Sequence, residues 1–192
     1  MARGRLGCTP ALGHEGEVLH TTRLRLEPLR REHAAVLHER IGDPRCYELL
    51  PTSPLSQAEL EARYAFLEHG TSTDGQEHWL SWTLFLQGEE LPVGTFQASL
   101  RDGVGGTLAY MIAPAFWRRG IASEAGHRVI RHLFEHYDCP LLTIEMDVRN
   151  VASIKLAESL GFSRMELKRD ADYFKGSTSH EYRYELLCNH DH

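Results

Sequence analysis

A short basic turn with small residues offers the clearest chemistry in this sequence. The turn reads Arg118-Arg119-Gly120-Ile121-Ala122 and precedes a segment with helical periodicity. The start of a helix leaves amide N–H groups without a helical partner and carries partial positive charge, so phosphate oxygens bind there. Glycine at position 120 lets the backbone approach a ligand closely, and the two arginines add formal charge. The turn therefore predicts an anion site, although a basic pair before a helix is also a common loop.

A second helix start follows further along the chain. Asn150 is a residue type that caps helices, Ser153 falls in the first turn, and Gly161 is the type that ends them. Each residue taken singly is an ordinary cap or helix residue. Two helix starts at the same end of neighbouring strands would form a crevice, which is where α/β sheets bind ligands. The second motif therefore strengthens the first only if the fold brings them together.

Two carboxylates alternate with apolar residues between these helix starts. Glu145 and Asp147 flank Met146, so the period of two of a strand places both acids on one face. Central parallel strands are normally apolar on both faces, so the pair indicates either a water-filled cleft or an edge strand or salt-bridged face. In a cleft, Glu145 is the first candidate for a general base, and Asp147, Glu68 and a chain of water molecules are alternatives.

The elements that position these residues follow from hydrophobic periodicity. The expected strands cover residues 19–29, 79–86, 91–100, 107–113, 141–148, 162–168 and 181–187. The expected helices cover 30–41, 56–67, 120–137 and 150–161, the second opening with a capping-box pattern at Ser56 and Glu59. Residues 169–180 are expected to form a loop around Gly176, in which Tyr173 and Phe174 are the aromatic residues best placed to contact a substrate.

The helix over 120–137 joins the fourth expected strand to the fifth. A strand–helix–strand crossover is right-handed and makes its two strands parallel neighbours. The basic turn and the helix start at Asn150 are then expected at the same end of these strands. The predicted class is α/β, with residues 18–190 forming one domain behind a mobile leader over 1–17.

Composition argues against several classes of protein. The 192 residues carry a net charge of -6 and no long Lys/Arg run, so we expect no nucleic-acid partner. No apolar run is long enough for a transmembrane helix, so we expect no membrane association. The 4 cysteines form no CxxC pair, which fits a reducing cytoplasm, and the 12 histidines form no HExxH motif, so we expect no metal site.

The two motifs at this spacing resemble the GNAT superfamily of acyl-CoA N-acyltransferases, and within it the RimJ/RimL-type branch that acetylates ribosomal-protein N-termini. The family's cofactor turn, Gln/Arg-x-x-Gly-x-Gly/Ala, matches Trp117 to Ala122 except at its first position. Trp117 itself, and the residues Ser123-Glu124-Ala125, are similar to that branch. The second motif, Asn-x-x-Ser-x-x-Leu-x-Glu-x-Leu-Gly-Phe, matches Asn150 to Phe162, and the resemblance covers about residues 18–188.

The resemblance implies a GNAT fold and a place for acetyl-CoA. The fold is a mixed, mostly antiparallel central sheet of about seven strands flanked by about four helices, with the fourth and fifth strands splayed around the cofactor. The pyrophosphate would lie on the amides of residues 118–122, while backbone amides around Met111 and Ile112 would contact the pantetheine arm and polarise the thioester carbonyl. Asn150 and Ser153 would reach the pantetheine and the sulfur.

One position departs from the family's pattern. Many members carry a tyrosine seven residues after the asparagine, which serves as acid to the leaving thiolate, whereas this chain has Ala157 there. Ser153 is the best substitute donor. A thiol with a pKa of about 8.5 is a tolerable leaving group with modest help, so the change does not exclude catalysis.

The activity implied is transfer of acetyl from acetyl-CoA to a primary amine by direct attack. A protein N-terminal α-amine is the leading acceptor, by resemblance to the ribosomal-protein branch. A small-molecule amine such as a drug, polyamine or amino acid is the alternative, and a non-catalytic acyl-CoA-binding module is the alternative from another class. The family resemblance also suggests a homodimer.

Overall fold

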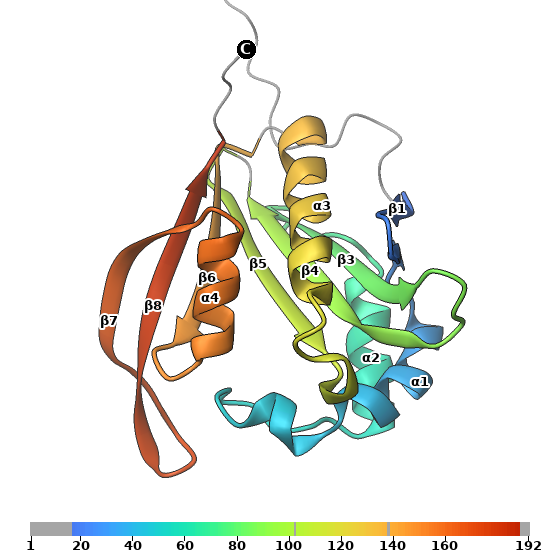
Figure 1. Cartoon of the computed structure of the whole chain (residues 1–192), viewed down its shortest axis with the longest axis horizontal. Coiled ribbons are helices and arrows are strands. Elements are labelled where there is room, and N and C mark those ends of the chain that lie inside the picture. The colour runs from blue at the N-terminus through green and yellow to red at the C-terminus, as the bar shows by residue number, and fades with distance from the viewer. Residues whose placement is uncertain (1–16, 102, 138, 189–192) are drawn as a thin grey trace, which may run out of the picture.

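The computed structural model describes residues 17–101, 103–137 and 139–188, and their strands form one eight-stranded sheet (Figure 1). The strands are β1 (Leu19–His20), β2 (Leu24–Pro28), β3 (Glu77–Leu86), β4 (Pro92–Arg101), β5 (Gly105–Ile112), β6 (Leu141–Asp147), β7 (Ser163–Phe174) and β8 (Ser177–Leu187). The α-helices are α1 (Ala34–Ile41), α2 (Gln57–Leu67), α3 (Ile121–His136) and α4 (Val151–Ser159). Short 3-10 helices are η1 (Arg31–His33), η2 (Pro44–Tyr47) and η3 (Pro114–Phe116).

The sheet is mixed, with the strand order β1-β2-β3-β4-β5-β6-β8-β7. Every pair of neighbouring strands is antiparallel except β5 and β6, which are joined through α3 and run parallel. These two strands correspond to the fourth and fifth strands expected from the sequence, so the predicted parallel pair and crossover are confirmed. The expected number of about seven strands is wrong by one.

The additional strand comes from the segment expected to be a single strand over 19–29. A tight turn divides it, because Thr21 N–H donates to Leu24 O at 2.9 Å and Leu24 N–H donates to Thr21 Oγ1 at 2.8 Å. The two halves then pair with each other as β1 and β2. Alternation alone does not reveal such a turn, since the apolar residues on either side of it still point into the same core.

The C-terminal hairpin also differs from its prediction. Residues 169–180 are mostly strand rather than loop, because β7 continues to Phe174 and β8 begins at Ser177. The connection is a two-residue turn at Lys175 and Gly176, both with positive φ, of 52° and 78°. Two consecutive positive-φ residues match the twist of a hairpin, so the strands extend up to the turn.

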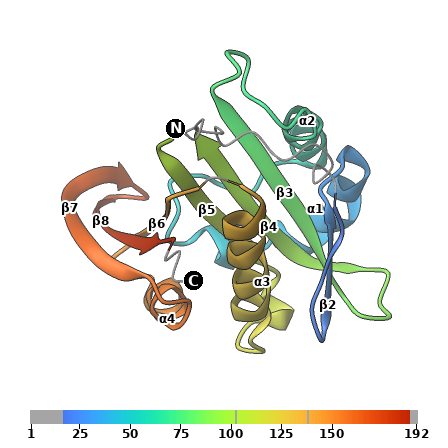
Figure 2. The ribbon, with the colours of Figure 1, turned by 90° about the horizontal axis from the view of Figure 1, so that it is seen from above.

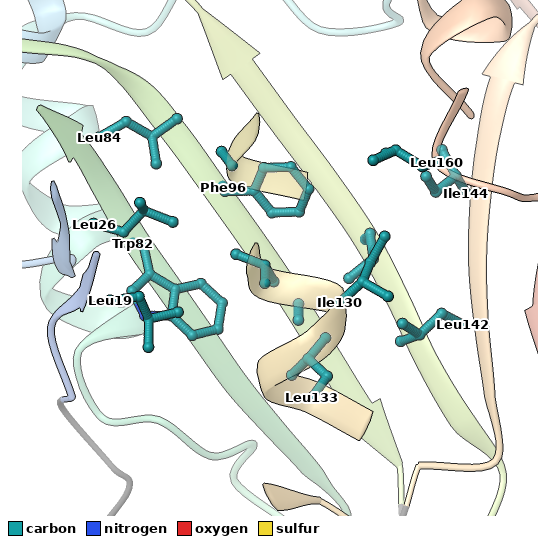
Figure 3. Close-up of a cluster of buried hydrophobic side chains, with 14 of the residues drawn as sticks. Leu19, Leu26, Trp82, Leu84, Phe96, Ile130, Leu133, Leu142, Ile144 and Leu160 are labelled. Atoms are coloured by element: carbon teal, nitrogen blue, oxygen red, sulfur yellow. The ribbon is translucent and has the colours of Figure 1, made fainter. Parts of the chain in front are cut away.

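Helices cover both faces of the sheet. Figure 2 shows α3 and α4 on one face and α1 and α2 on the other. The main core lies under α3 and α4, where Ile130 and Leu133 of α3 pack toward Phe96 of β4 and Leu142 of β6 (Figure 3). A smaller core lies under α1 and α2 and includes Tyr64. This two-layer burial fixes the starts of α3 and α4 relative to β5 and β6.

Helix signals in the sequence predicted the helices well. The capping box at the start of α2 is formed, with Ser56 N–H donating to Glu59 Oε2 at 2.8 Å and Glu59 N–H donating to Ser56 Oγ at 3.3 Å. At the end of α4, Gly161 adopts a φ of 91°, as expected of a glycine that terminates a helix.

The expected leader over 1–17 lies outside the described residues except for Glu17, so it stays a prediction. None of the helices in the described ranges is sufficiently long and apolar to span a bilayer. The same residues bring together no group of three His, Cys, Asp or Glu side chains suited to a metal ion.

Two glycines allow β4, β5 and β6 to approach closely where β5 begins. A Cβ on Gly105 would collide with the carbonyl oxygen of Leu141, and a Cβ on Gly106 would lie 2.5 Å from Leu100 Cδ2. Gly105 also has a φ of 129°, which side chains rarely adopt. The closed end of the β5–β6 pair therefore depends on the absence of side chains at these positions.

We expect Gly105→Ala to lower the free energy of unfolding by about 3 kcal/mol or more, because backbone strain and a backbone clash add together. Gly88→Ala is the matched control, since Gly88 also has positive φ (80°) but nothing lies within 4 Å of its Cβ position. The control should lose only about 1 kcal/mol. Urea unfolding of both variants measures the difference, and equal losses would contradict the close approach.

Candidate active site

β5 and β6 pair over only two positions before they separate. Their register joins Gly106 to Leu142 and Thr107 to Thr143. At this vertex the two threonine hydroxyls lie 3.1 Å apart, and Thr143 Oγ1 also donates to Gly106 O at 3.3 Å. No further β5–β6 pairing occurs in the described residues, so a gap opens between the strands beyond the vertex (Figure 1).

The peptide groups of β5 alternate between β4 and this gap. Ala113 N–H donates to Val93 O of β4 at 2.9 Å, and a Cβ on Gly94 would run into Met111 O, so the peptide groups of residues 111 and 113 face β4. Alternation turns those of Ile112 the other way. Its carbonyl accordingly accepts from Trp117 Nε1 at 2.7 Å. Of the two residues expected at the pantetheine arm, Ile112 directs its peptide groups into the gap, whereas Met111 directs its peptide groups toward β4.

The basic turn leads directly into α3. Arg118 and Gly120 both have positive φ, of 60° and 74°, and Gly120 is the N-cap of the helix. Ile121 and Ala122 are the first two helical residues, so their N–H groups have no acceptor within the helix. The turn and helix start expected from the sequence are therefore present, at the end of β5 where the gap is open.

Arginine side chains gather on two aromatic rings next to this turn. The guanidinium of Arg119 lies 5.2 Å from the ring centre of Phe116, and that of Arg40 lies 5.8 Å from the same ring. Arg45 lies 5.9 Å from the ring of Trp117. Arg40 and Arg119 thus bring positive charge beside the start of α3, whereas the charge of Arg45 is paired with Asp43, with Arg45 Nη2 2.7 Å from Asp43 Oδ2. Arg40 and Arg45 could not be assigned to the site from sequence because they lie far from the turn along the chain.

The negative charge of Glu124 would repel an anion at this helix start, but hydrogen bonds from Arg23 and Thr21 compensate that charge. Arg23 Nε donates to Glu124 Oε2 at 2.6 Å, and Arg23 N–H and Thr21 Oγ1 donate to Oε1 at 2.9 and 2.5 Å. Burial alone would raise the pKa of Glu124, but these hydrogen bonds outweigh it and lower that pKa. Arg23 Nη1 also donates to Arg119 O at 2.9 Å, which ties the β1–β2 turn to the basic turn.

The start of α4 provides the other side of the gap. Asn150 caps the helix, since its Oδ1 accepts from Ser153 N–H at 3.1 Å. Ser153 Oγ lies 2.7 Å from Tyr110 OH, a residue of β5. Ala157 is buried one turn further along the helix. Hydroxyl groups from β5 and α4 therefore meet between the two elements.

The two acids of β6 share a face as expected, but their surroundings differ. Glu145 is exposed and accepts from Lys168 Nζ at 2.6 Å. Asp147 is only 4% exposed and accepts from both Arg149, at 2.6 and 2.8 Å, and Ser179 Oγ, at 2.7 Å. The Arg149 hydrogen bonds hold the pKa of Asp147 far below its usual range, so this carboxylate is a structural anion rather than a base.

Glu68, an alternative base expected from the sequence, does not lie beside β6. It follows the C-terminal end of α2 and lines a surface hollow with Arg30 and Arg31, on the face covered by α1 and α2.

Glu181 is an acid that sequence reasoning did not single out. It lies on β8 directly opposite Asp147, and it is partly buried. Burial raises its pKa, and the nearby charges of Glu145, Asp172 and Asp147 raise it further, against an opposing effect of Lys168. The alternation of Glu181, Arg183 and Glu185 along the last strand was the signal that could have indicated it.

The tip of the β7–β8 hairpin reaches the segment around η2. Lys175 Nζ donates to Tyr47 O and, at 3.5 Å, to Thr52 O. Of the two aromatic residues expected near a substrate, Phe174 is buried and Tyr173 is 68% exposed. The hairpin and the η2 segment therefore join at the bottom of the molecule in Figure 1, below the open end of the gap.

Comparisons with known proteins agree on the kind of domain. The family described as "Acetyltransferase (GNAT) domain" matches residues 23–163. An uncharacterised N-acetyltransferase p20 of Bacillus licheniformis is 27% identical over 173 residues, which cover 89% of this chain and 96% of that protein.

Solved structures share the fold. A Salmonella typhimurium acetyltransferase described as modifying the N-terminal serine of a 50S ribosomal subunit protein matches with a TM-score of 0.76 at 20% identity, over 89% of this chain and 99% of that one. RimL, a ribosomal alpha-N-protein acetyltransferase in complex with coenzyme A, matches with a TM-score of 0.74 at 20% identity, over 91% of this chain and 100% of that one.

We expect Gly120→Glu to weaken acetyl-CoA binding by about 100-fold or more, because a carboxylate would stand where the pyrophosphate is expected. Gly120→Gln is the matched control, since it adds the same positive-φ strain and nearly the same volume without charge. Isothermal titration calorimetry measures both affinities. If the two variants bind equally well, the pyrophosphate does not lie at this helix start.

Proposed function

This chain belongs to the GNAT acetyltransferase family, and we propose that it transfers the acetyl group of acetyl-CoA to the α-amine at a protein N-terminus. The family assignment makes it an acyltransferase that uses acetyl-CoA. The acceptor is the proposed part, and one observation carries it. The chain shares its fold over most of its length with an enzyme described as modifying the N-terminal serine of a ribosomal protein.

The cofactor is proposed to lie along the gap between β5 and β6. Its pyrophosphate would accept hydrogen bonds from the amides of residues 118–122, beside the positive charge of Arg118 and Arg119. The pantetheine arm would pass Ile112, whose peptide groups face away from β4, and reach Asn150 at the start of α4. This placement satisfies backbone groups of β5 that β6 leaves without a strand partner.

Catalysis is proposed to proceed by direct attack within a complex of both substrates. The Ile112 amide would donate to the thioester oxygen, where negative charge develops as the amine nitrogen adds to the carbonyl carbon. The amine would lose a proton to a carboxylate on the exposed side of β6 and β8. Ser153 would donate to the sulfur as the carbon–sulfur bond breaks.

The charge of the site fits a protein N-terminus as acceptor. An α-amino group has a pKa of about 7.7–8.0, whereas a lysine side chain has a pKa of about 10.4. A carboxylate can therefore deprotonate an α-ammonium group much more readily than a lysine ammonium group. Glu181, on the same face of β6 and β8 as the Lys168-paired Glu145, would also attract a cationic acceptor.

We expect CoA release with short N-terminal peptides to exceed that with free amines by at least about tenfold in kcat/KM. The assay measures free CoA thiol over a panel of peptides with unblocked N-termini, the same peptides with blocked N-termini and an internal lysine, and small amines such as polyamines. Preference for the small amines would reject the protein acceptor. Acetyl-CoA binding without turnover on any amine would indicate a binding module.

We propose Glu145 as the base and expect Glu145→Gln to lower kcat by about 100-fold. Glu181→Gln is the parallel variant, because Glu181 lies on the same face of the sheet and its pKa is raised by burial and by nearby acids. Loss of a base with a raised pKa changes the dependence of activity on pH in a defined way. Wild-type activity falls as the pH drops through that pKa, since the protonated carboxyl cannot accept a proton, and the variant loses this acidic limb. If only Glu181→Gln abolishes the limb, Glu181 is the base and Glu145 is not.

A further inference from the structure

A tyrosine hydroxyl from β5 reaches the serine at the start of α4. Tyr110 OH and Ser153 Oγ lie 2.7 Å apart, across the separation between β5 and α4. The chain has Ala157 where many relatives carry a tyrosine on α4, and that alanine lies one helical turn after Ser153. A phenolic hydroxyl is therefore present at this end of the gap, but it comes from the strand rather than from the helix.

Other contacts hold both partners of this hydrogen bond. The ring of Tyr110 stacks on Phe96, with ring centres 5.9 Å apart and an angle of 21° between the planes, and the two residues are direct neighbours in the β4–β5 register. Ser153 is held at its backbone, because its N–H donates to Asn150 Oδ1. The Tyr110 ring and the Ser153 backbone are each held by contacts other than the one between the two hydroxyl groups, so the fold itself brings these hydroxyls together.

The geometry allows either hydroxyl to donate, and acidity favours Tyr110 as the donor. A phenol is more acidic than an alkyl alcohol and is the better donor, while the serine oxygen has two lone pairs to accept with. Burial raises the pKa of Tyr110, an effect that its hydrogen bond to Ser153 opposes only in part. The phenol therefore keeps its hydrogen at neutral pH, which is far below this raised pKa.

We propose that Tyr110 is a positioning residue for Ser153: it donates its hydrogen to Ser153 Oγ and thereby directs the single hydrogen of Ser153 toward the sulfur of coenzyme A. This inference rests on the proposed role of Ser153 at the sulfur. Without Tyr110, the serine hydroxyl rotates freely among acceptors. With Tyr110, one of its lone pairs is occupied and its own hydrogen is polarised, which strengthens the bond that it donates.

The step that this arrangement assists is cleavage of the carbon–sulfur bond. The amine nitrogen forms a bond to the carbonyl carbon, the carbon–sulfur bond breaks, and its electron pair goes to sulfur. Ser153 donates a hydrogen bond to that electron pair and keeps its proton. The proton lost by the amine goes to the carboxylate base, and the thiolate of coenzyme A takes up a proton from solvent after release.

The sharpest test needs no acceptor, because coenzyme A itself is the probe. Hydrogen bonds to a thiolate stabilise the charged form and lower the pKa of the thiol. The pKa of bound coenzyme A is read from the ultraviolet absorbance of its thiolate as the pH is raised. We expect Ser153→Ala to raise this pKa by about one unit and Tyr110→Phe to raise it by about half a unit. In the Ser153→Ala background, Tyr110→Phe should add nothing.

A kinetic cycle provides the second readout. Tyr110→Phe should lower kcat by about fivefold to tenfold with little change in the KM for acetyl-CoA, and the effect should vanish in the Ser153→Ala background. Tyr137→Phe is the matched control, because it removes a buried phenol hydroxyl just beyond the far end of α3 and should leave both readouts unchanged. Phenylalanine at 110 retains the ring that stacks on Phe96, and thermal unfolding checks that the fold is intact.

The results for the two variants distinguish a failure of the Tyr110 role from a failure of the proposed Ser153 role. If Ser153→Ala leaves the thiol pKa unchanged, the proposed role of Ser153 is wrong and the role of Tyr110 falls with it. If Ser153→Ala raises the pKa and Tyr110→Phe does not, only the inference about Tyr110 is overturned. If the two effects add in the double variant, Tyr110 acts independently of Ser153, which also overturns it.

Discussion

Every proposed feature of the site depends on the brief pairing of two parallel strands. β5 and β6 are held together at Gly106–Leu142 and Thr107–Thr143, and then they separate. Backbone N–H and C=O groups that lose a strand partner must find another, and a ligand lying in the gap can serve. The glycines at the start of β5 permit the tight vertex, while the crossover through α3 and the packing of α4 set where the strands go afterwards. The gap is thus a consequence of the main-chain path rather than of any particular polar side chain.

An acidic protein can bind a pyrophosphate when its positive charge is gathered locally. The net charge is -6, yet Arg40 and Arg119 lie on the ring of Phe116 beside the start of α3, while Arg45 on the ring of Trp117 is paired with Asp43. The aromatic rings hold guanidinium groups that would otherwise spread over solvent. Thr21 and Arg23 engage the one carboxylate in the first turn of α3, so that its charge is not left to repel an anion.

The acids near the gap illustrate how surroundings divide similar groups into different roles. Asp147 is buried, hydrogen-bonded by Arg149 and Ser179, and permanently ionised at neutral pH, so it organises the end of β6. Glu145, two residues earlier, is exposed and paired with Lys168. Burial raises the pKa of Glu181, and the nearby charges of both of these acids raise it further. Burial and like charges brought together across β6 and β8 thus shift the pKa of Glu181 in the opposite direction from that of Asp147.

The sequence by itself determined the fold class, the parallel pair, the helix starts at Gly120 and Asn150 and the sharing of a face by Glu145 and Asp147, because caps, glycines and periodicity act over a few residues. It did not determine the turn at Thr21 that creates the eighth strand, or the length of the β7–β8 hairpin, because both depend on pairing that leaves the hydrophobic pattern unchanged. Only the tertiary structure decided that Ile112 rather than Met111 turns its peptide groups toward the gap, that Glu181 lies beside Asp147, and that Tyr110 meets Ser153. These are contacts between residues far apart in the chain, and strand register and helix packing, not local residue types, bring them together.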